Sequence, residues 1–114
     1  TALDFALVRL NSVVKNLNVY PKKMRKNLDI TKGLFFSQRV LLELTNKGLS
    51  REQAYSIVQK NAMKAWNNQT TFLEVLLKDK IVSKKIPVNK LKQLFNFSYH
   101  TKKINIIFNR SLKK

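Results

Sequence analysis

The chain has 114 residues, of which 44% are hydrophobic and 10% aromatic, and its net charge is +17. This length and apolar content suit one globular domain and argue against a disordered chain. Because cysteine is absent, disulfides and cysteine-based zinc sites are excluded, and no apolar run is long enough to span a bilayer. The sequence has two glycines and two prolines, which favours long regular elements with few tight turns.

The positive charge raises nucleic acids and anionic membranes as possible partners. However, the basic residues comprise 18 lysines and 5 arginines, and the lysines are spread along the whole chain. Arginine is the residue that makes bidentate contacts to phosphates and bases. A basic nucleic-acid-binding module therefore remains an alternative. A peripheral membrane binder ranks lower, because no helix shows a cleanly basic polar face.

The first segment predicts a helix with an apolar seam of heptad period. Further apolar residues point away from this seam, so the helix requires several packing neighbours. We expect residues 1–18 to be the C-terminal end of a long bundle helix, cut from its partners. The seam residues are Leu3, Leu7, Leu10, Val14 and Leu17.

Two breaks divide the next part of the chain into three predicted helices. Pro21 suits the first turn of a short basic helix over 22–29, and Gly33 precedes a helix that ends before Gly48. Ser50 and Gln53 have capping-box spacing and begin the third helix. We expect Leu34, Val40, Leu41 and Leu44 to face inward on the second of these helices. The expected buried stripe of the third is Ala54, Ile57, Val58, Ala62, Ala65 and Trp66.

Three further helices are predicted before the chain ends. Thr71 and Glu74 repeat the capping-box spacing, and Ile86-Pro87 breaks the chain again. The last two helices cover 88–95 and roughly 99–110, and no segment alternates with the period of a strand. We therefore predict an all-α fold of about six or seven helices with short loops. The inward residues of the last two helices are expected to be Leu91, Leu94, Phe95, Ile104, Ile107 and Phe108.

Candidate catalytic groups are scarce. The chain has one histidine and six scattered acidic residues, so no metal site is expected, and no glycine-rich phosphate loop is present. His100 is the only side chain with an ordinary pKa near neutrality. No carboxylate or nucleophile lies near it in the sequence, which favours a surface or capping histidine over a general base.

Ser37 and Arg39 interrupt an apolar run, and both residue types are common in active sites. On a helix, Ser37 would lie at the edge of the core, and Arg39 would face solvent or a neighbouring domain. A nucleophilic serine requires a positioned base, and none is evident, so structural roles are favoured for both. We predict no catalytic, cofactor-binding, metal-binding or substrate-binding residue in this chain.

One basic cluster could attract an anion, although a solvated helix face is the favoured interpretation. The cluster consists of Lys22, Lys23, Arg25 and Lys26.

The run "VYPKKMRKNLDITKGLFFSQRVLLELTNKGLSREQAYSIVQKNAMKAW", Val19 to Trp66, resembles the C-terminal domain of the adenylosuccinate lyase family. That family, part of the fumarase/aspartase superfamily, shows V-Y-P-x-x-M-x-x-N-L-D-x-T-x-G-L-x-x-S-Q-R-V-L-L. The tail "LFNFSYHTKKINIIFNR" is similar to its closing F-D-x-x-Y-x-x-x-x-x-D-x-I-F-x-R. Residues 19–114 would then form the C-terminal helical domain. A sister lactonizing-enzyme branch shares a related domain and remains a second alternative.

The resemblance implies that the whole enzyme is a cytoplasmic homotetramer of the purine pathway. It would eliminate fumarate from adenylosuccinate, giving AMP, and from the succinylaminoimidazole carboxamide ribotide, without a metal or organic cofactor. The family's catalytic serine loop and histidines lie upstream of this segment, and Ser37 occupies the S-Q-R position, which is not the catalytic serine. The resemblance therefore implies that this chain alone is inactive. Its roles would be helical support, subunit contact and shaping of the active-site mouth.

Several positions depart from the family pattern toward lower acidity. Asn96, Asn105 and Asn109 stand where the family often has acids, and Lys22 and Asn67 where it commonly has Glu. The lost acids explain part of the positive charge without a nucleic-acid partner.

Overall fold

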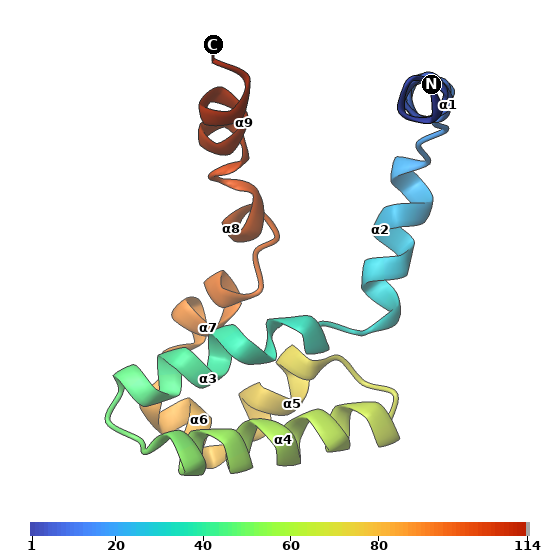
Figure 1. Cartoon of the computed structure of the whole chain (residues 1–114). Coiled ribbons are helices and arrows are strands. Elements are labelled where there is room, and N and C mark those ends of the chain that lie inside the picture. Colours follow the sequence, from blue (N-terminus) through green and yellow to red (C-terminus); the bar gives the residue numbers. More distant parts are fainter. Residues whose placement is uncertain (114) are drawn as a thin grey trace. The chain divides into compact units, whose positions relative to one another are not determined.

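A computed structural model of the chain describes residues 1–113 (Figure 1). In this range the chain forms nine α-helices and one 3₁₀ turn, and it forms no strand. The helices belong to two compact units, Thr1–Ile30 and a second unit that begins at Thr31. The prediction of an all-α fold is confirmed.

The helix bounds agree with the predicted order, but two predicted helices are each divided in two. Asp79 has extended backbone (φ −79°, ψ 122°) and separates α5 from α6, and residues 102–103 separate α8 from α9. The elements are α1 Ala2–Lys15, α2 Pro21–Ile30, η1 Leu34–Phe36, α3 Ser37–Asn46, α4 Arg51–Asn67, α5 Phe72–Lys78, α6 Lys80–Lys85, α7 Val88–Leu94, α8 Ser98–Thr101 and α9 Ile104–Leu112.

The first unit consists of α1 and α2, and its described helices bury no residue. The apolar seam of α1 lies open, with Leu3 70% exposed and Leu7 56% exposed. Helix α2 begins at Pro21, as its fixed φ predicts, whereas α1 ends at Lys15 and leaves Leu17 outside the helix. Whether residues 1–18 end a longer bundle helix stays a prediction.

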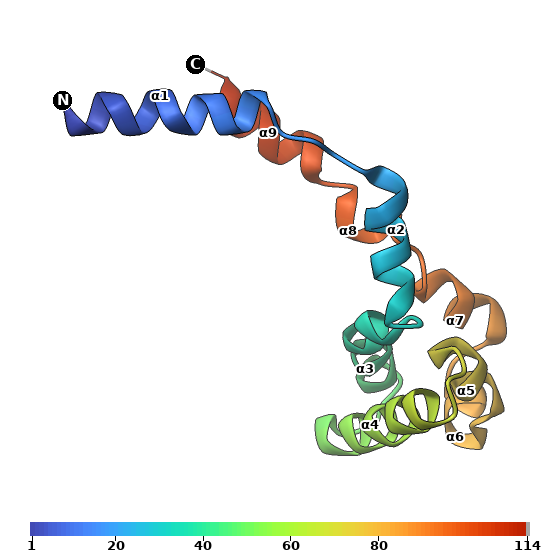
Figure 2. The ribbon, with the colours of Figure 1, turned by 90° about the vertical axis from the view of Figure 1, so that its right-hand side faces the viewer.

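The core of the second unit is formed by α3 to α7, which are gathered together in both views (Figures 1 and 2). Its apolar centre joins residues of all five helices, and Leu34, Leu41 and Phe95 pack against it while half-buried. The expected inward face of α3 is thus confirmed. The buried centre consists of Val40, Leu44, Ala54, Val58, Ala65, Phe72, Leu76, Val82, Ile86, Leu91 and Leu94.

The corner between α3 and α4 uses the predicted capping signals. Gly48 has a φ of +90°, and its amide donates to the carbonyl of Thr45 at 3.0 Å. The amide of Leu49 donates to the carbonyl of Leu44 at 3.3 Å, which completes a Schellman motif. Ser50 and Gln53 then form both hydrogen bonds of a capping box at the start of α4. These bonds satisfy the free backbone groups at the corner where α3 meets α4.

Two expectations about buried residues are wrong. Trp66 is 63% exposed, because the buried seam of α4 runs through Asn61 and Ala65 and Trp66 lies about 100° further around the helix. On α9, Ile104, Ile107 and Phe108 are 41%, 61% and 57% exposed. Figures 1 and 2 show α8 and α9 extending away from the core of the second unit, so among residues 31–113 no element of this unit covers that face of α9.

Gly33 offers a direct test of the junction before α3. Its φ is +87°, and an added Cβ would lie 3.2 Å from Cε1 of Phe95, which is tighter than ordinary van der Waals contact. Gly33→Ala should therefore lower the free energy of unfolding by about 2–3 kcal/mol, from the left-handed backbone and the crowding together. Urea denaturation of the chain measures this loss.

Gly48→Ala is the matched control. Gly48 has a similar φ of +90°, but a Cβ there meets nothing within 4 Å. Its substitution should cost about 1 kcal/mol, from the backbone conformation alone. Equal losses at the two positions would show that Phe95 does not restrict Gly33.

Candidate functional site

Arg39 forms a structural clamp between helices. Its guanidinium Nη1 donates to the carbonyl of Leu94, the last residue of α7, and to the carbonyl of Asn96 at 3.4 Å. The guanidinium carbon also lies 3.9 Å from the ring centroid of Tyr99 in α8. The expectation that Arg39 faces solvent or another domain is therefore wrong. The side chain is half-buried and satisfies carbonyl groups that the end of α7 leaves free.

Ser37 and His100 show no catalytic arrangement. Ser37 is the half-buried first residue of α3, at the edge of the core as expected. His100 is exposed, and its ring lies 5.4 Å from Tyr99, 6.0 Å from Phe36 and 6.4 Å from Phe35 between centroids. These ring contacts fit a surface histidine at the edge of an aromatic cluster.

The predicted basic cluster lies on α2, where all four of its side chains are exposed. The Nζ atom of Lys23 lies 5.5 Å from the ring centroid of Tyr20, the residue that precedes the helix. A shallow hollow at this place is lined by consecutive residues only, Val19 to Lys23. The cluster is therefore a helix face and not a site assembled from separate elements.

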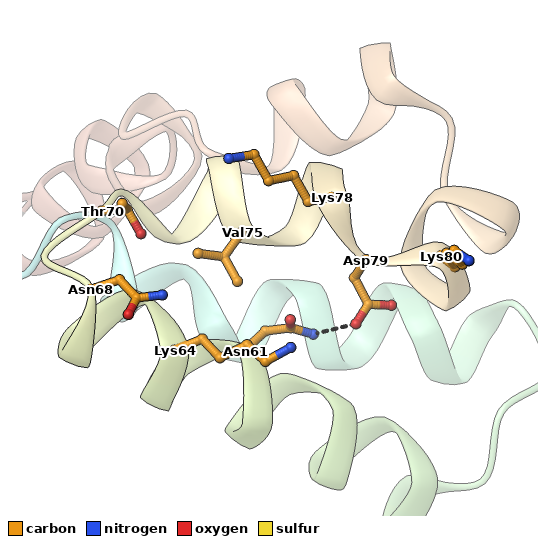
Figure 3. Close-up of a pocket in the computed structure, with 8 residues that line it drawn as sticks. All are labelled: Asn61, Lys64, Asn68, Thr70, Val75, Lys78, Asp79 and Lys80. Carbon is orange, nitrogen blue, oxygen red and sulfur yellow. Dashed lines mark hydrogen bonds between the residues drawn. The ribbon is translucent and has the colours of Figure 1, made fainter.

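A second polar feature was not predicted from the sequence: a cleft between α4 and the α5–α6 corner (Figure 3). Its volume is about 360 Å³. Lysine is the most frequent residue along it, and its one acidic side chain is Asp79. The lining residues are Asn61, Lys64, Asn68, Thr70, Val75, Lys78, Asp79 and Lys80.

At one end of the cleft, Asn61 and Asp79 join α4 to the start of α6. Asn61 is 1% exposed, and its Nδ2 donates to Oδ2 of Asp79 at 3.0 Å and to the carbonyl of Ile57 at 2.9 Å. Oδ1 of Asp79 accepts the amides of Ile81 at 2.9 Å and Val82 at 3.1 Å, so it caps α6. The carboxylate thus accepts three hydrogen bonds from two elements.

These interactions lower the pKa of the Asp79 carboxyl. Burial by itself raises that pKa, because it disfavours the charged form. The hydrogen bonds from Asn61 and from the amides of Val82 and Ile81, with the nearby positive charge of Lys64, outweigh burial and bring the pKa below its usual value. The ionised form therefore stabilises the fold.

The described residues do not assemble a recognisable catalytic centre. Within residues 1–113, no group of three metal-ligating side chains comes together. The cleft supplies amides, ammonium groups and one carboxylate, but neither Ser37 nor His100 lines it. The cleft was not predicted from the sequence. One signal for it was present: Ala54, Val58, Asn61 and Ala65 follow one another at spacings of 4, 3 and 4, which indicates that Asn61 is buried with the other three.

Comparisons with known proteins show where the chain belongs. The family model "Adenylosuccinate lyase C-terminus" matches residues 33–111. The chain belongs to the adenylosuccinate lyase family. It is 51% identical to the adenylosuccinate lyase of Helicobacter pylori over 94% of this chain and 27% of that protein. For the adenylosuccinate lyase of Thermotoga maritima, identity is 48% over 98% of this chain and 26% of that protein.

A third adenylosuccinate lyase, from Bacillus subtilis, is 42% identical over 96% of this chain and 25% of its own length. The chain thus spans about a quarter of the length of the curated relatives that it matches. The matched range contains Ser37, Arg39, Asp79 and His100, so each belongs to the adenylosuccinate lyase C-terminal region. Within residues 1–113, no helix is both long and apolar enough to cross a membrane.

The Asp79 network predicts a stability difference that depends on pH. In Asp79→Asn, either orientation of the new amide turns its NH₂ group toward a donor, Asn61 or the amides of α6. The variant should lose about 1–3 kcal/mol of unfolding free energy near neutral pH. The pKa of Asp79 is lower in the folded state than in the unfolded state. The extra stability of the native chain is therefore fully present above the unfolded-state pKa, and it is lost as the pH falls through the folded-state pKa.

Urea denaturation from about pH 7 to about pH 3 would measure how the difference changes as the carboxyl is protonated. Glu52→Gln is the control, because Glu52 is an exposed carboxylate in the first turn of α4. A difference for Asp79→Asn that stays constant over this range would contradict the charge-dependent role.

The Arg39 clamp predicts a local loss of order in α8. Arg39→Met removes the hydrogen bonds to the end of α7 and the stacking on Tyr99, and should cost about 1–3 kcal/mol. Hydrogen exchange of the amides in residues 98–101 should accelerate. Arg51→Met is the control, because Arg51 is exposed at the start of α4. Equal changes in stability and hydrogen exchange for the two substitutions would contradict the clamp.

Proposed function

We propose that this chain is the C-terminal, non-catalytic portion of an adenylosuccinate lyase. The whole enzyme would eliminate fumarate from adenylosuccinate to give AMP. It would also release fumarate from the succinylaminoimidazole carboxamide ribotide. The match of residues 33–111 to the C-terminal family model carries this proposal, and the coverage of about a quarter of each relative supports it.

The chemistry of such an elimination explains why this portion would be inactive by itself. The reaction needs a base to take a proton from the succinyl carbon and an acid to protonate the departing amine. Both groups must reach the same substrate. Here His100 contacts aromatic rings and Ser37 lies at the start of α3, so they do not form such a pair. By the resemblance, the catalytic serine loop and histidines would lie upstream.

The role of this portion would be support and subunit contact within a cytoplasmic homotetramer. Residues 1–18 would continue the last helix of a central bundle, and 19–114 would form the C-terminal helical domain. The exposed seam of α1 supports this assignment, because an uncovered apolar stripe in water requires a packing partner. The same requirement applies to the apolar residues of α9.

A basic nucleic-acid-binding module is a weaker candidate. The charge of +17 favours it, but specific recognition also requires aromatic or arginine side chains placed on the binding surface. Arg39 is engaged with Leu94 and Tyr99, and Phe36, Phe72 and Phe95 are packed in or against the core. We therefore propose that neither a specific nucleic acid nor a membrane is a partner of this chain.

A lyase assay tests the proposal. The whole enzyme, with its upstream sequence, should convert adenylosuccinate to AMP and fumarate, followed by the change in ultraviolet absorbance. Residues 1–114 alone should give no turnover above the uncatalysed rate at the same molar concentration. Turnover by the isolated chain would refute the non-catalytic role. A whole protein that is folded but inactive on both substrates would refute the proposed enzyme.

A further inference from the structure

The lining of the cleft in Figure 3 includes three ammonium groups. They belong to Lys64 of α4, Lys78 at the end of α5 and Lys80 at the start of α6. Within the described part of the chain, residues 1–113, none of the three forms a hydrogen bond or an ion pair. Three charges of the same sign along one cleft raise the local positive potential.

Three other lysines of the same unit do have partners. Lys32 donates to the carbonyl of Gln69 at 2.6 Å, and Lys85 to the carbonyl of Lys47 at 3.4 Å. The Nζ atom of Lys102 lies 4.6 Å from the ring centroid of Tyr99. The cleft lysines are therefore not explained by a structural contact of this kind.

The single carboxylate in the cleft does not cancel these charges. Asp79 already accepts three hydrogen bonds, from Asn61 and from the amides of Ile81 and Val82. Lys64 attracts it, but this attraction is the smallest of the influences on its pKa. Three ammonium groups and one carboxylate leave the lining net positive.

The end of the cleft away from Asp79 offers further hydrogen-bonding groups. Figure 3 shows Asn68 and Thr70 at this end, with Lys64 along one side of the cleft and Lys78 along the other. The hydroxyl of Thr70 is buried and has no hydrogen-bond partner among the described residues. An unpaired buried hydroxyl is costly, so a ligand oxygen that reaches it after rotation of the side chain would gain a hydrogen bond.

We propose that this cleft binds a small oxyanion, of the phosphate or carboxylate class, which the exposed and flexible side chains of Lys64 and Lys78 reach by rotation from its two sides. The amide of Asn68 is the neutral donor beside it. The volume of about 360 Å³ accommodates one such group. This site is separate from the proposed elimination chemistry and does not depend on it, because no atom of the cleft is assigned a catalytic role.

Calorimetric titration of the whole chain with inorganic phosphate, in chloride buffer of constant ionic strength, tests the proposal. Binding should saturate with a dissociation constant on the order of 1 mM, as expected for an exposed site with two or three cations. Lys64→Met/Lys78→Met should weaken it by about tenfold. Both lysines are exposed, so the substitutions leave the core intact, which circular dichroism verifies.

Lys90→Met/Lys92→Met is the control, because it removes the same charge from α7 outside the cleft. It should change phosphate affinity less than twofold. A parallel titration with acetate distinguishes a phosphate site from a carboxylate site. If phosphate binds more tightly than acetate, the site is a phosphate site. If acetate binds equally or more tightly, the site is a carboxylate site. Absence of saturable binding to both anions, or equal weakening by the two double variants, would overturn the proposal.

Discussion

The hydrogen bond between Asn61 and Asp79 is the contact on which the arrangement of α4, α5 and α6 depends. Asn61 is 1% exposed and is the buried polar side chain of the described core, so it requires an acceptor. Asp79 supplies that acceptor and, through its other oxygen, caps α6. The cap fixes the direction in which α6 leaves the corner. Val82 and Ile86 then reach the core that α3 and α4 have begun.

The clamp formed by Arg39 plays a comparable part at the other side of this unit. Its planar guanidinium can donate to two carbonyls and lie against a ring at the same time, which a lysine cannot do. The clamp therefore holds the end of α7 and the start of α8 to α3. Beyond α8, no comparable contact is found in the described part of the second unit, and the apolar side chains of α9 are exposed. A packed centre with exposed apolar residues in α9 supports the proposed role of a domain within a larger assembly.

The sequence predicted the helices well where local signals decide their limits. Pro21, Gly48 and the Ser50–Gln53 capping box mark boundaries that the structure reproduces, because each acts through its own backbone. It predicted less well where tertiary contacts decide. Asp79 lies within the single helix that was predicted before Ile86-Pro87, and its cap on α6 divides that helix into two. Trp66 is large and apolar, but the buried seam of α4 is completed by Asn61 instead.

The same distinction governs the candidate sites. A long run of matching residues was enough to predict family membership. The contacts of Arg39 could not be predicted in this way, because its partners Leu94 and Asn96 lie 55 and 57 residues away along the chain. The basic residues divide in a similar way. Those of α2 follow one another in the sequence and share one helix face, where each can be hydrated separately. Those of the cleft come from α4, α5 and α6, and the Asn61–Asp79 bond holds these helices together. An ionised Asp79 therefore maintains a cleft whose net charge is opposite to its own.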